Sequence, residues 1–302
     1  MTPVLVSGAS GFVGSRLASA LVGDGHEVRA MTRHPDDYTG AGRPVYGDVA
    51  DRGSLRSALD GVSAAYYLVH SLASDNFRRK DAEAAGEFGR AAADAGLERL
   101  IYLGGLGDDS EELSEHLRSR REVEHLLGEA GVPVTVLRAA IIVGDGGISW
   151  EITRQLVERL PAMVAPHWVT TKTQPIALHD VISYLVGVLE PAEARGRTYE
   201  IGGPDVLTYA EMMQRVARIR RARNLPIVVV PLLTPRLSSR WLALVTDVDT
   251  ATGRNLVDSM SNEVIISDHS ISSVVPIEPM GYDEAVRQAL AEHDHAIARH
   301  ER

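Results

Sequence analysis

The chain has 302 residues, of which 44% are hydrophobic and 24% are charged, a mixture typical of globular proteins and unlike that of disordered chains. Its 31 Lys and Arg against 41 Asp and Glu give a formal net charge of −10, which argues against nucleic acid as a partner because nucleic-acid binders usually carry a basic face. The absence of cysteine excludes disulfides, thiolate metal sites and a cysteine nucleophile, and it fits a reducing compartment.

The amino-terminal residues carry no pattern of a secretory leader, so we expect a cytoplasmic protein. No transmembrane segment is expected, because a span needs about 18 consecutive apolar residues. The best run, 225–233, is short and contains Pro226 and Pro231. Arg236 and Arg240 lie beside another apolar run, which leaves peripheral membrane contact as an alternative to ordinary packing.

In the first half of the chain, short apolar runs alternate with longer segments of helical periodicity, which predicts an α/β fold with a doubly wound, mostly parallel sheet. Strands are expected at 4–7, 27–31, 44–46, 64–69, 99–103 and 134–137. Helices are expected between them at 12–22, 54–59, 76–95 and 114–129. Gly96 and Gly131 stand where the last two of these helices would end.

The second half predicts a smaller, mostly helical lobe, with helices at 149–160, 181–189, 209–220, 237–245, 250–260 and 283–299. We therefore divide the chain into a first lobe, 1–145, and a second lobe, 146–302. Strands near 175–178 and 198–201 are left open as additions to the first lobe. The last helix carries His293, His295 and His300, which we interpret as a solvated helix end and not as a metal site. No metal site is predicted elsewhere, because no H-x-x-x-H or H-E-x-x-H pattern occurs.

The strongest motif is a G-x-x-G-x-x-G pattern that follows the first strand and opens the first helix. Such a turn lets the backbone approach a pyrophosphate, which then binds to the free N–H groups of the helix N-terminus. The pattern therefore predicts a dinucleotide site. Its expected contacts are Ser7, Gly8, Ser10, Gly11, Phe12, Val13 and Gly14.

Two residues further along bear on the nucleotide's adenosine half. Many such folds end the second strand with an acid that binds the ribose. Here the segment 28–35 contains no acid, and Arg33 stands at the end of the strand. An arginine can pair with a 2′-phosphate, so NADP(H) is expected and NAD(H) is less favoured. Asp48 after the third strand is a candidate acceptor for the adenine amino group, and helix capping is its competing role.

These residues resemble the short-chain dehydrogenase/reductase superfamily, in its extended or atypical branch with NmrA-like and epimerase-like members, and the resemblance covers nearly the whole chain. It implies that Asp48 and Val49 contact the adenine, and that Leu68, Val69 and His70 line the nicotinamide ribose. Further matches are the L-R-A-A segment at 137–140, the segment 173–181 around Asp180, and the Y-x-I-G-G segment at 199–203.

The resemblance breaks down at the superfamily's proton relay, where a Tyr hydroxyl and a Lys four residues on are assisted by a Ser or Thr after the fifth strand. Here the serine position is glycine, within 104–107, and the Tyr-x-x-x-Lys pair is replaced by His116 and Arg120. A spacing of four places both side chains on one helix face. His116 is the candidate proton donor or acceptor, and Arg120 would bind the ribose and disfavour the protonated imidazole.

A polar face that only caps the nucleotide is the competing interpretation of His116 and Arg120. Tyr66, Tyr67 and Tyr102 are alternative hydroxyls, with core packing as their more ordinary role. The substrate pocket is expected between the strand ends and the second lobe. Its candidate lining residues, each also a candidate for the core, are Trp150, Met163, Trp168, Gln174 and Trp241.

The sequence thus predicts an NADP(H)-dependent oxidoreductase that transfers hydride to or from a small carbonyl or enone compound. A non-catalytic redox sensor or assembly factor remains as an alternative, because the serine and tyrosine of the relay are missing. A nucleotide-sugar epimerase-like isomerase is a weaker alternative. A small molecule is the expected partner, and the sequence leaves the oligomeric state open.

Overall fold

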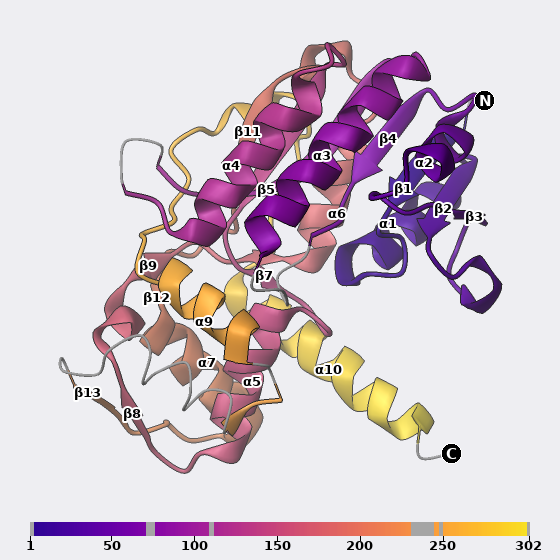
Figure 1. The fold of residues 1–302 in the computed structure, drawn as a ribbon. Helices are drawn as coiled ribbons and strands as arrows, with labels where there is room; N and C mark the ends of the chain where they lie inside the picture. Colours follow the sequence, from indigo (N-terminus) through magenta and orange to yellow (C-terminus); the bar gives the residue numbers. More distant parts are fainter. Residues whose placement is uncertain (1–2, 71–75, 109–111, 231–244, 248–249, 301–302) are drawn as a thin grey trace.

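The computed structural model describes residues 3–70, 76–108, 112–230, 245–247 and 250–300. Its largest feature is a seven-stranded sheet in the order β11-β6-β5-β4-β1-β2-β3, in which every strand pair is parallel (Figure 1). The strands are β1 (Val4–Ser7), β2 (Val28–Thr32), β3 (Arg43–Tyr46), β4 (Ala64–Tyr67), β5 (Arg99–Gly105), β6 (Val134–Ala139) and β11 (Thr198–Ile201). The predicted doubly wound sheet is therefore confirmed, and the segment near 198–201 supplies its seventh strand.

Helices cover both faces of this sheet. On one face lie α1 (Phe12–Gly23) and α6 (Leu178–Gly187), and on the other lie α2 (Arg52–Leu59), α3 (Phe77–Asp94) and α4 (Glu115–Gly128). Successive strand side chains point to opposite faces. Tyr66 accordingly belongs to the core beneath α1 and α6, and Tyr67 to the core beneath α3 and α4.

The second lobe is built from α5 (Ile148–Arg159), α7 (Tyr209–Arg221), α9 (Thr250–Ser259) and α10 (Tyr282–His300), which share one apolar core. In Figure 1 these helices lie below the sheet, and the end of α10 projects away from the rest of the molecule. Short 3₁₀ turns occur at Pro35–Asp37, His167–Thr170, Ala192–Ala194 and Ser270–Ser273. Most of the helix predicted at 237–245 lies outside the described residues.

Three short strand pairs in and next to the second lobe were not predicted as such. They are β7 (Ile142–Val143) with β10 (Ile176–Ala177), β8 (Met163–Ala165) with β13 (Ile227–Val229), and β9 (Lys172–Thr173) with β12 (Leu207–Thr208). The strand expected near 175–178 thus pairs with β7 and does not join the large sheet. Strands of two or three residues are too short to show an alternating hydrophobic pattern, which is why periodicity missed them.

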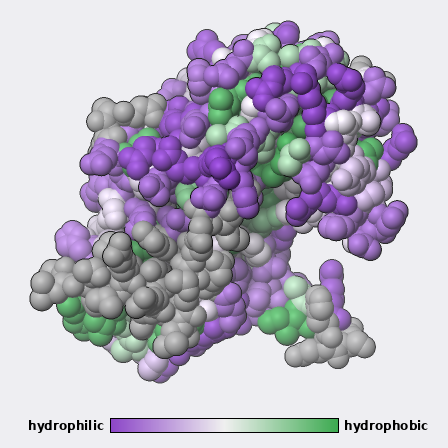
Figure 2. All heavy atoms as spheres, in the orientation of Figure 1, coloured by the Kyte–Doolittle hydropathy of each residue, from purple (hydrophilic) through white to green (hydrophobic). Residues whose placement is uncertain are grey.

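The surface is mostly hydrophilic in the view of Figure 2, with an apolar area at the end of the second lobe where β8 and β13 lie. Val164 and Val228 are both more than half exposed there. None of the helices in the described part of the chain combines the length and the apolar character that crossing a membrane requires.

Candidate nucleotide and active site

The turn between β1 and α1 has the geometry that the glycine motif predicts. Gly8 has φ +67°, and a Cβ atom there would lie 3.0 Å from the carbonyl oxygen of Leu68. A Cβ atom on Gly14 would lie 2.1 Å from the carbonyl oxygen of Gly8, so only glycine lets α1 pack this close to the turn. Ser10 and Gly11 are exposed at the start of the helix, where the unpaired N–H groups of its first turn can bind an anion.

Ser7 supports this turn from below and does not face it. Its side chain is fully buried, donates a hydrogen bond to the carbonyl oxygen of Tyr66 (2.9 Å) and accepts one from the amide of Leu68 (3.1 Å). The hydroxyl therefore joins β1 to β4 and is not available to a nucleotide. The prediction of Ser7 as a cofactor contact can hold only for its backbone.

The topology of the sheet divides the candidate site into two halves. From β1 the chain proceeds to β2 and β3 on one side, and then returns to β4, β5 and β6 on the other. Ligands of such sheets bind at the carboxyl ends of the strands, at the point where the strand order reverses. Arg33 and Asp48 follow strands on the first side, and Leu68 to His70 follow β4 on the second.

On the first side, Arg33 is exposed and takes part in no ion pair with the described residues. Asp48 is half-buried, and one of its carboxylate oxygens accepts a hydrogen bond from the amide of Ala50 (2.9 Å). The N-cap of α2 is Asp51, whose carboxylate accepts from the amide of Gly53. The competing role considered for Asp48, capping this helix, therefore belongs to Asp51.

On the second side, the structure brings His70, His116, Arg120 and Tyr102 together from β4, β5 and α4. Burial, the charge of Arg120 and the nearby His70 lower the pKa of His116 to about 3, so its ring is neutral near physiological pH. Both of its ring nitrogens are buried and have no hydrogen-bond partner among the described residues. The pKa of His70 is also lowered, mainly by desolvation and then by the charge of Arg120. Part of the His70 residue is exposed to solvent, which reduces its desolvation.

Arg120 itself is 7% exposed, which is unusual for a side chain that always carries a charge. Its helical neighbour Arg121 pairs with Glu124 at 3.0 Å, whereas Arg120 forms no ion pair with a carboxylate in the described part of the chain. Burial raises the pKa of Tyr102 and the charge of Arg120 lowers it, because the guanidinium lies close to the buried Tyr102 hydroxyl.

Glycine at positions 104 and 105 of β5 leaves room for side chains of α4. A Cβ atom on Gly104 would lie 2.7 Å from Oε1 of Glu124, and one on Gly105 would lie 2.9 Å from a methyl group of Leu117. Arg121 reinforces this contact by donating to the carbonyl oxygens of Gly105 (2.8 Å) and Gly107 (2.7 Å).

Other residues of the family-like segments have structural partners. Arg138 of the L-R-A-A segment pairs with Glu124 at 2.8 Å. The side-chain amide of Gln174 donates a hydrogen bond to the carbonyl oxygen of Gly203 and accepts one from the backbone amide of Ile266. Asp180 is buried and accepts from the amide of Met280, which fixes the start of the last helix. Gln174 therefore does not line a pocket with its polar end.

The remaining alternative residues mostly belong to the core. Tyr66 donates to the carbonyl oxygen of Leu185, and Tyr67 packs against Phe88 with ring centroids 5.0 Å apart. Trp150 and Met163 lie in the core of the second lobe. Trp168 packs edge-on against Tyr209. Trp241, Arg236 and Arg240 lie outside the described residues.

The second lobe reaches the site through α9, which packs against α4. The side chain of Asn262, just after α9, accepts from the amide of Ser114 and donates to the carbonyl oxygen of Glu112, both at 3.1 Å. Ser114 is the N-cap of α4 and accepts from the amide of Leu117. The second lobe therefore fixes the end of the helix that carries His116.

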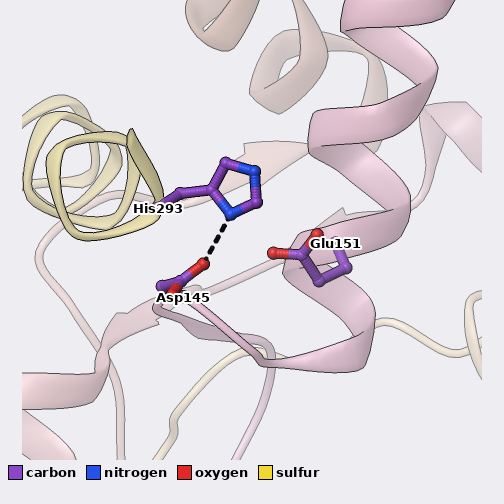
Figure 3. Close-up of side chains that lie close together, drawn as sticks. All are labelled: Asp145, Glu151 and His293. Carbon is purple, nitrogen blue, oxygen red and sulfur yellow. Dashed lines mark hydrogen bonds and ion pairs between the residues drawn. The ribbon is translucent and has the colours of Figure 1, made fainter. Parts of the chain in front are cut away.

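Sequence reasoning missed a group formed by Asp145, Glu151 and His293, shown in Figure 3. Gly144 and Glu292, the chain neighbours of Asp145 and His293, line a cavity of about 180 Å³ together with Arg16. Asp145 and Glu151 lie close together in the sequence, but His293 is 148 residues from Asp145, and no recognisable spacing joins it to them. Nδ1 of His293 lies at hydrogen-bond distance from Oδ1 of Asp145 (2.9 Å), and its side chain is mostly buried, so it is not the solvated residue of a frayed helix end that the tail composition suggested.

Comparison with known proteins agrees with this geometry. The profile of a family described as NAD(P)H-binding matches residues 8–166. A reductase of Streptomyces griseus, (4-alkanoyl-5-oxo-2,5-dihydrofuran-3-yl)methyl phosphate reductase, is 28% identical over 228 residues, which cover 72% of this chain and 73% of the relative. Ceramide reductase of Caulobacter vibrioides is 25% identical over 73% of this chain and 71% of its own length.

A third relative is the mitochondrial NADH dehydrogenase (ubiquinone) 1 alpha subcomplex subunit 9 of Arabidopsis thaliana, which is 26% identical over 69% of this chain. The chain spans just over half of that protein, 56%.

Solved structures share the fold at low sequence identity. The NADPH complex of an Escherichia coli NADPH-dependent quinone oxidoreductase superposes with a TM-score of 0.76 at 19% identity, covering 94% of this chain and 98% of that one. The NADP(H) complex of a Citrobacter triphenylmethane reductase gives 0.77 at 16% identity, covering 95% and 99%. The predicted resemblance is confirmed for the Rossmann-type fold and the NAD(P)-binding domain, while the roles of His116 and Arg120 stay predictions.

Proposed function

Because the chain belongs to the NAD(P)H-binding family, we propose that it is an NADP(H)-dependent oxidoreductase that moves hydride between the nicotinamide and a carbonyl or enone substrate. In this proposal residues 1–145, together with α6 and β11 of the same sheet layers, bind the cofactor, and α5, α7, α9 and α10 supply the wall of the substrate site. The cofactor, when bound, supplies the hydride. The protein's own residues bind, orient and stabilise charge.

The observation that carries the proposal is the unpaired charge of Arg120 at the carboxyl end of the sheet. A buried guanidinium without a carboxylate costs free energy in the protein alone, and an oxygen-rich ligand restores its hydrogen bonds. Arg120 lies with His116 beyond β4 and β5, on the half of the sheet where the nicotinamide is expected. We assign Arg120 to the ribose hydroxyls and to the negative charge that develops on the substrate oxygen.

The low pKa of His116 narrows the substrate class. Reduction of an isolated ketone creates an alkoxide that needs a proton at once, and a neutral imidazole is a poor acid. Reduction of an enone is less demanding. Hydride adds to the β-carbon, the π electrons move to the carbonyl oxygen as an enolate, and the α-carbon takes a proton from water afterwards. A neutral N–H of His116 and the charge of Arg120 would stabilise that enolate.

Arg33 supports NADP(H) over NAD(H) as the cofactor. Its guanidinium is exposed after β2 and unpaired among the described residues, so it can meet a 2′-phosphate without breaking an existing ion pair. Asp48 would accept from the adenine amino group with the carboxylate oxygen that does not bind Ala50.

A non-catalytic NADP(H) sensor or assembly factor is the second candidate. The glycines at 104 and 105 in place of a hydroxyl residue support it, and so does the likeness to a subunit of NADH dehydrogenase. The epimerase-like alternative has less support, because position 116 lacks the tyrosine of the superfamily's relay.

The proposal is tested by comparing Arg120→Gln with Arg118→Gln, since Arg118 is an exposed arginine on the same helix. Enones and quinones are screened for oxidation of NADPH, and kcat/KM is then measured for the best substrate. Loss of a charge stabiliser should lower kcat/KM by about 10²- to 10³-fold in Arg120→Gln and leave Arg118→Gln close to wild type. Equal rates in both variants would contradict the role of Arg120, and binding of NADPH without oxidation of it by any compound would favour the sensor.

A further inference from the structure

We propose that Asp145, Glu151 and His293 form a binding site for one divalent transition-metal ion of the zinc class. The three residues come from the loop after β7, from the first turn of α5 and from α10. Figure 3 shows the side chains converging from these elements, with a carboxylate oxygen of Glu151 directed toward Asp145 and His293. This inference is independent of the proposed function.

The distances suit a single ion. One donor atom from each residue lies within 4.8 Å of the other two, and Nδ1 of His293 is 2.9 Å from Oδ1 of Asp145. Metal–nitrogen and metal–oxygen bonds of about 2.0 to 2.2 Å place neighbouring ligand atoms roughly 3 Å apart. Asp145 and His293 are thus already as far apart as two ligands of one ion. The carboxylate of Glu151 can reach the same ion by a change in its side-chain conformation.

Glu151 supplies an observation that is separate from the clustering. Its Oε2 is held by Arg154 at 2.6 Å, but its Oε1 is buried and has no hydrogen-bond partner among the described residues. A buried carboxylate oxygen without a partner is unfavourable, and a cation between the three side chains would remove that cost. Arg154 keeps Glu151 oriented, as residues around a metal site usually do for its ligands.

The surrounding charge also favours a cation. Arg154 is shared between Glu151 and Glu158, and the guanidinium of Arg16 reaches Glu292 at 3.8 Å. Arg220 in turn pairs with Glu158 and with Asp294, so these three arginines face four carboxylates in addition to that of Asp145. A divalent cation among these side chains would offset the excess of negative charge.

The donor set identifies the class of ion. Imidazole favours Zn²⁺ and its transition-metal neighbours over Mg²⁺ and Ca²⁺, which prefer oxygen ligands alone. Three protein ligands leave a fourth position for water.

Such an ion would join the last helix to the cofactor-binding half of the molecule. The loop that carries Asp145 packs on Phe12 at the start of α1, and the carbonyl oxygen of Asp145 accepts from Arg16 at 2.9 Å. Metal bound by this loop and by α10 would stabilise the folded protein, because the unfolded chain has no preformed site.

The test titrates chelator-treated, desalted full-length protein with Zn²⁺ by calorimetry, and with Co²⁺ while its visible absorption is followed. Wild type should bind one equivalent of Zn²⁺, give a Co²⁺ ligand-field band and unfold at a higher temperature with metal. His293→Ala should weaken binding by about 100-fold or more, since changes merely around ligands already cost about 10- to 100-fold. The control His295→Ala, exposed two residues along on the same helix, should bind as wild type does.

Asp145→Asn keeps the shape of the side chain and guards against misfolding of the alanine variant. Circular dichroism in chelator must show that each variant is folded. Loss of the cobalt band in Asp145→Asn with a wild-type fold supports the site. Equal zinc binding by His293→Ala and wild type would overturn the proposal. The proposal would also fail if His293→Ala bound zinc while His295→Ala did not, or if wild type bound none.

Discussion

His116 is neutral in the folded protein because its ring is buried beside a permanent charge. The pKa of His116 is about 3 in the folded chain, against an ordinary value of 6.5. Between these two values the unfolded chain binds more protons than the folded one, so acid favours unfolding. The contribution of the neutral, buried His116 to the free energy of unfolding is fully present above pH 6.5 and is lost as the pH falls toward 3.

We therefore expect His116→Gln to lose less stability than wild type does when the pH is lowered from about 7 to about 4.5. The measurement is the urea midpoint at both pH values. His125→Gln is the control, since His125 is exposed on the same helix. If His116→Gln is as acid-sensitive as wild type, the ring is not desolvated in the way that the structure shows.

Arg33 is expected to set the choice between the two nicotinamide cofactors. An ionic hydrogen bond contributes about 1.5 to 3 kcal/mol, so Arg33→Gln should weaken NADPH binding by about tenfold to a hundredfold. NADH binding should stay as in wild type, because NADH has no 2′-phosphate. Fluorescence titration measures both, with the exposed Arg56→Gln as control. An equal loss of affinity for NADPH and NADH would mean that Arg33 does not contact the 2′-phosphate.

At the scale of elements, α1 contains two glycines that differ in their surroundings: Gly14 packs on the turn after β1, and Gly23 lies at the end of the helix. A Cβ atom on Gly14 would lie 2.1 Å from a backbone oxygen, whereas one on Gly23 would meet nothing within 4 Å. Gly14→Ala should therefore lose NADPH binding and about 1 to 3 kcal/mol of unfolding free energy. Gly23→Ala should retain both, and titration with urea unfolding decides between these outcomes. Normal NADPH binding by Gly14→Ala would contradict the assignment of the turn.

The strands and helices of the first half could be predicted because each has its own local signal. Buried runs such as 64–67 and the glycine turn identify the strands, and helical periodicity identifies α3 and α4. Local patterns could not predict that the hydroxyl of Ser7 joins β1 to β4, nor that side chains of α4 occupy the space beside Gly104 and Gly105. Both facts depend on residues that are distant in sequence. For the same reason, Asp145, Glu151 and His293 were not grouped.

At the scale of the whole molecule, the two lobes meet where α9 packs on α4. Asn262 makes two hydrogen bonds to the segment that begins α4. Asn262→Ala should cost about 1 kcal/mol for each lost bond and increase amide exchange around 114–118, with NADPH binding unchanged. Exchange measured by mass spectrometry tests this, and Asn224→Ala, an exposed asparagine in the second lobe, is the control. Unchanged exchange in Asn262→Ala would mean that α4 is held by the sheet alone.

We propose that the whole molecule binds NADP(H) and uses it to reduce an electron-poor substrate. The most direct measurement titrates the purified protein with NADPH and NADH by nicotinamide fluorescence, and then adds enones, quinones, aldehydes and ketones while the absorbance of NADPH is followed. We expect tighter binding of NADPH than of NADH, and oxidation of NADPH by enones ahead of simple ketones. Failure to bind either cofactor would contradict the proposed NADP(H) site, and binding of NADPH without oxidation by any compound would contradict the proposed chemistry.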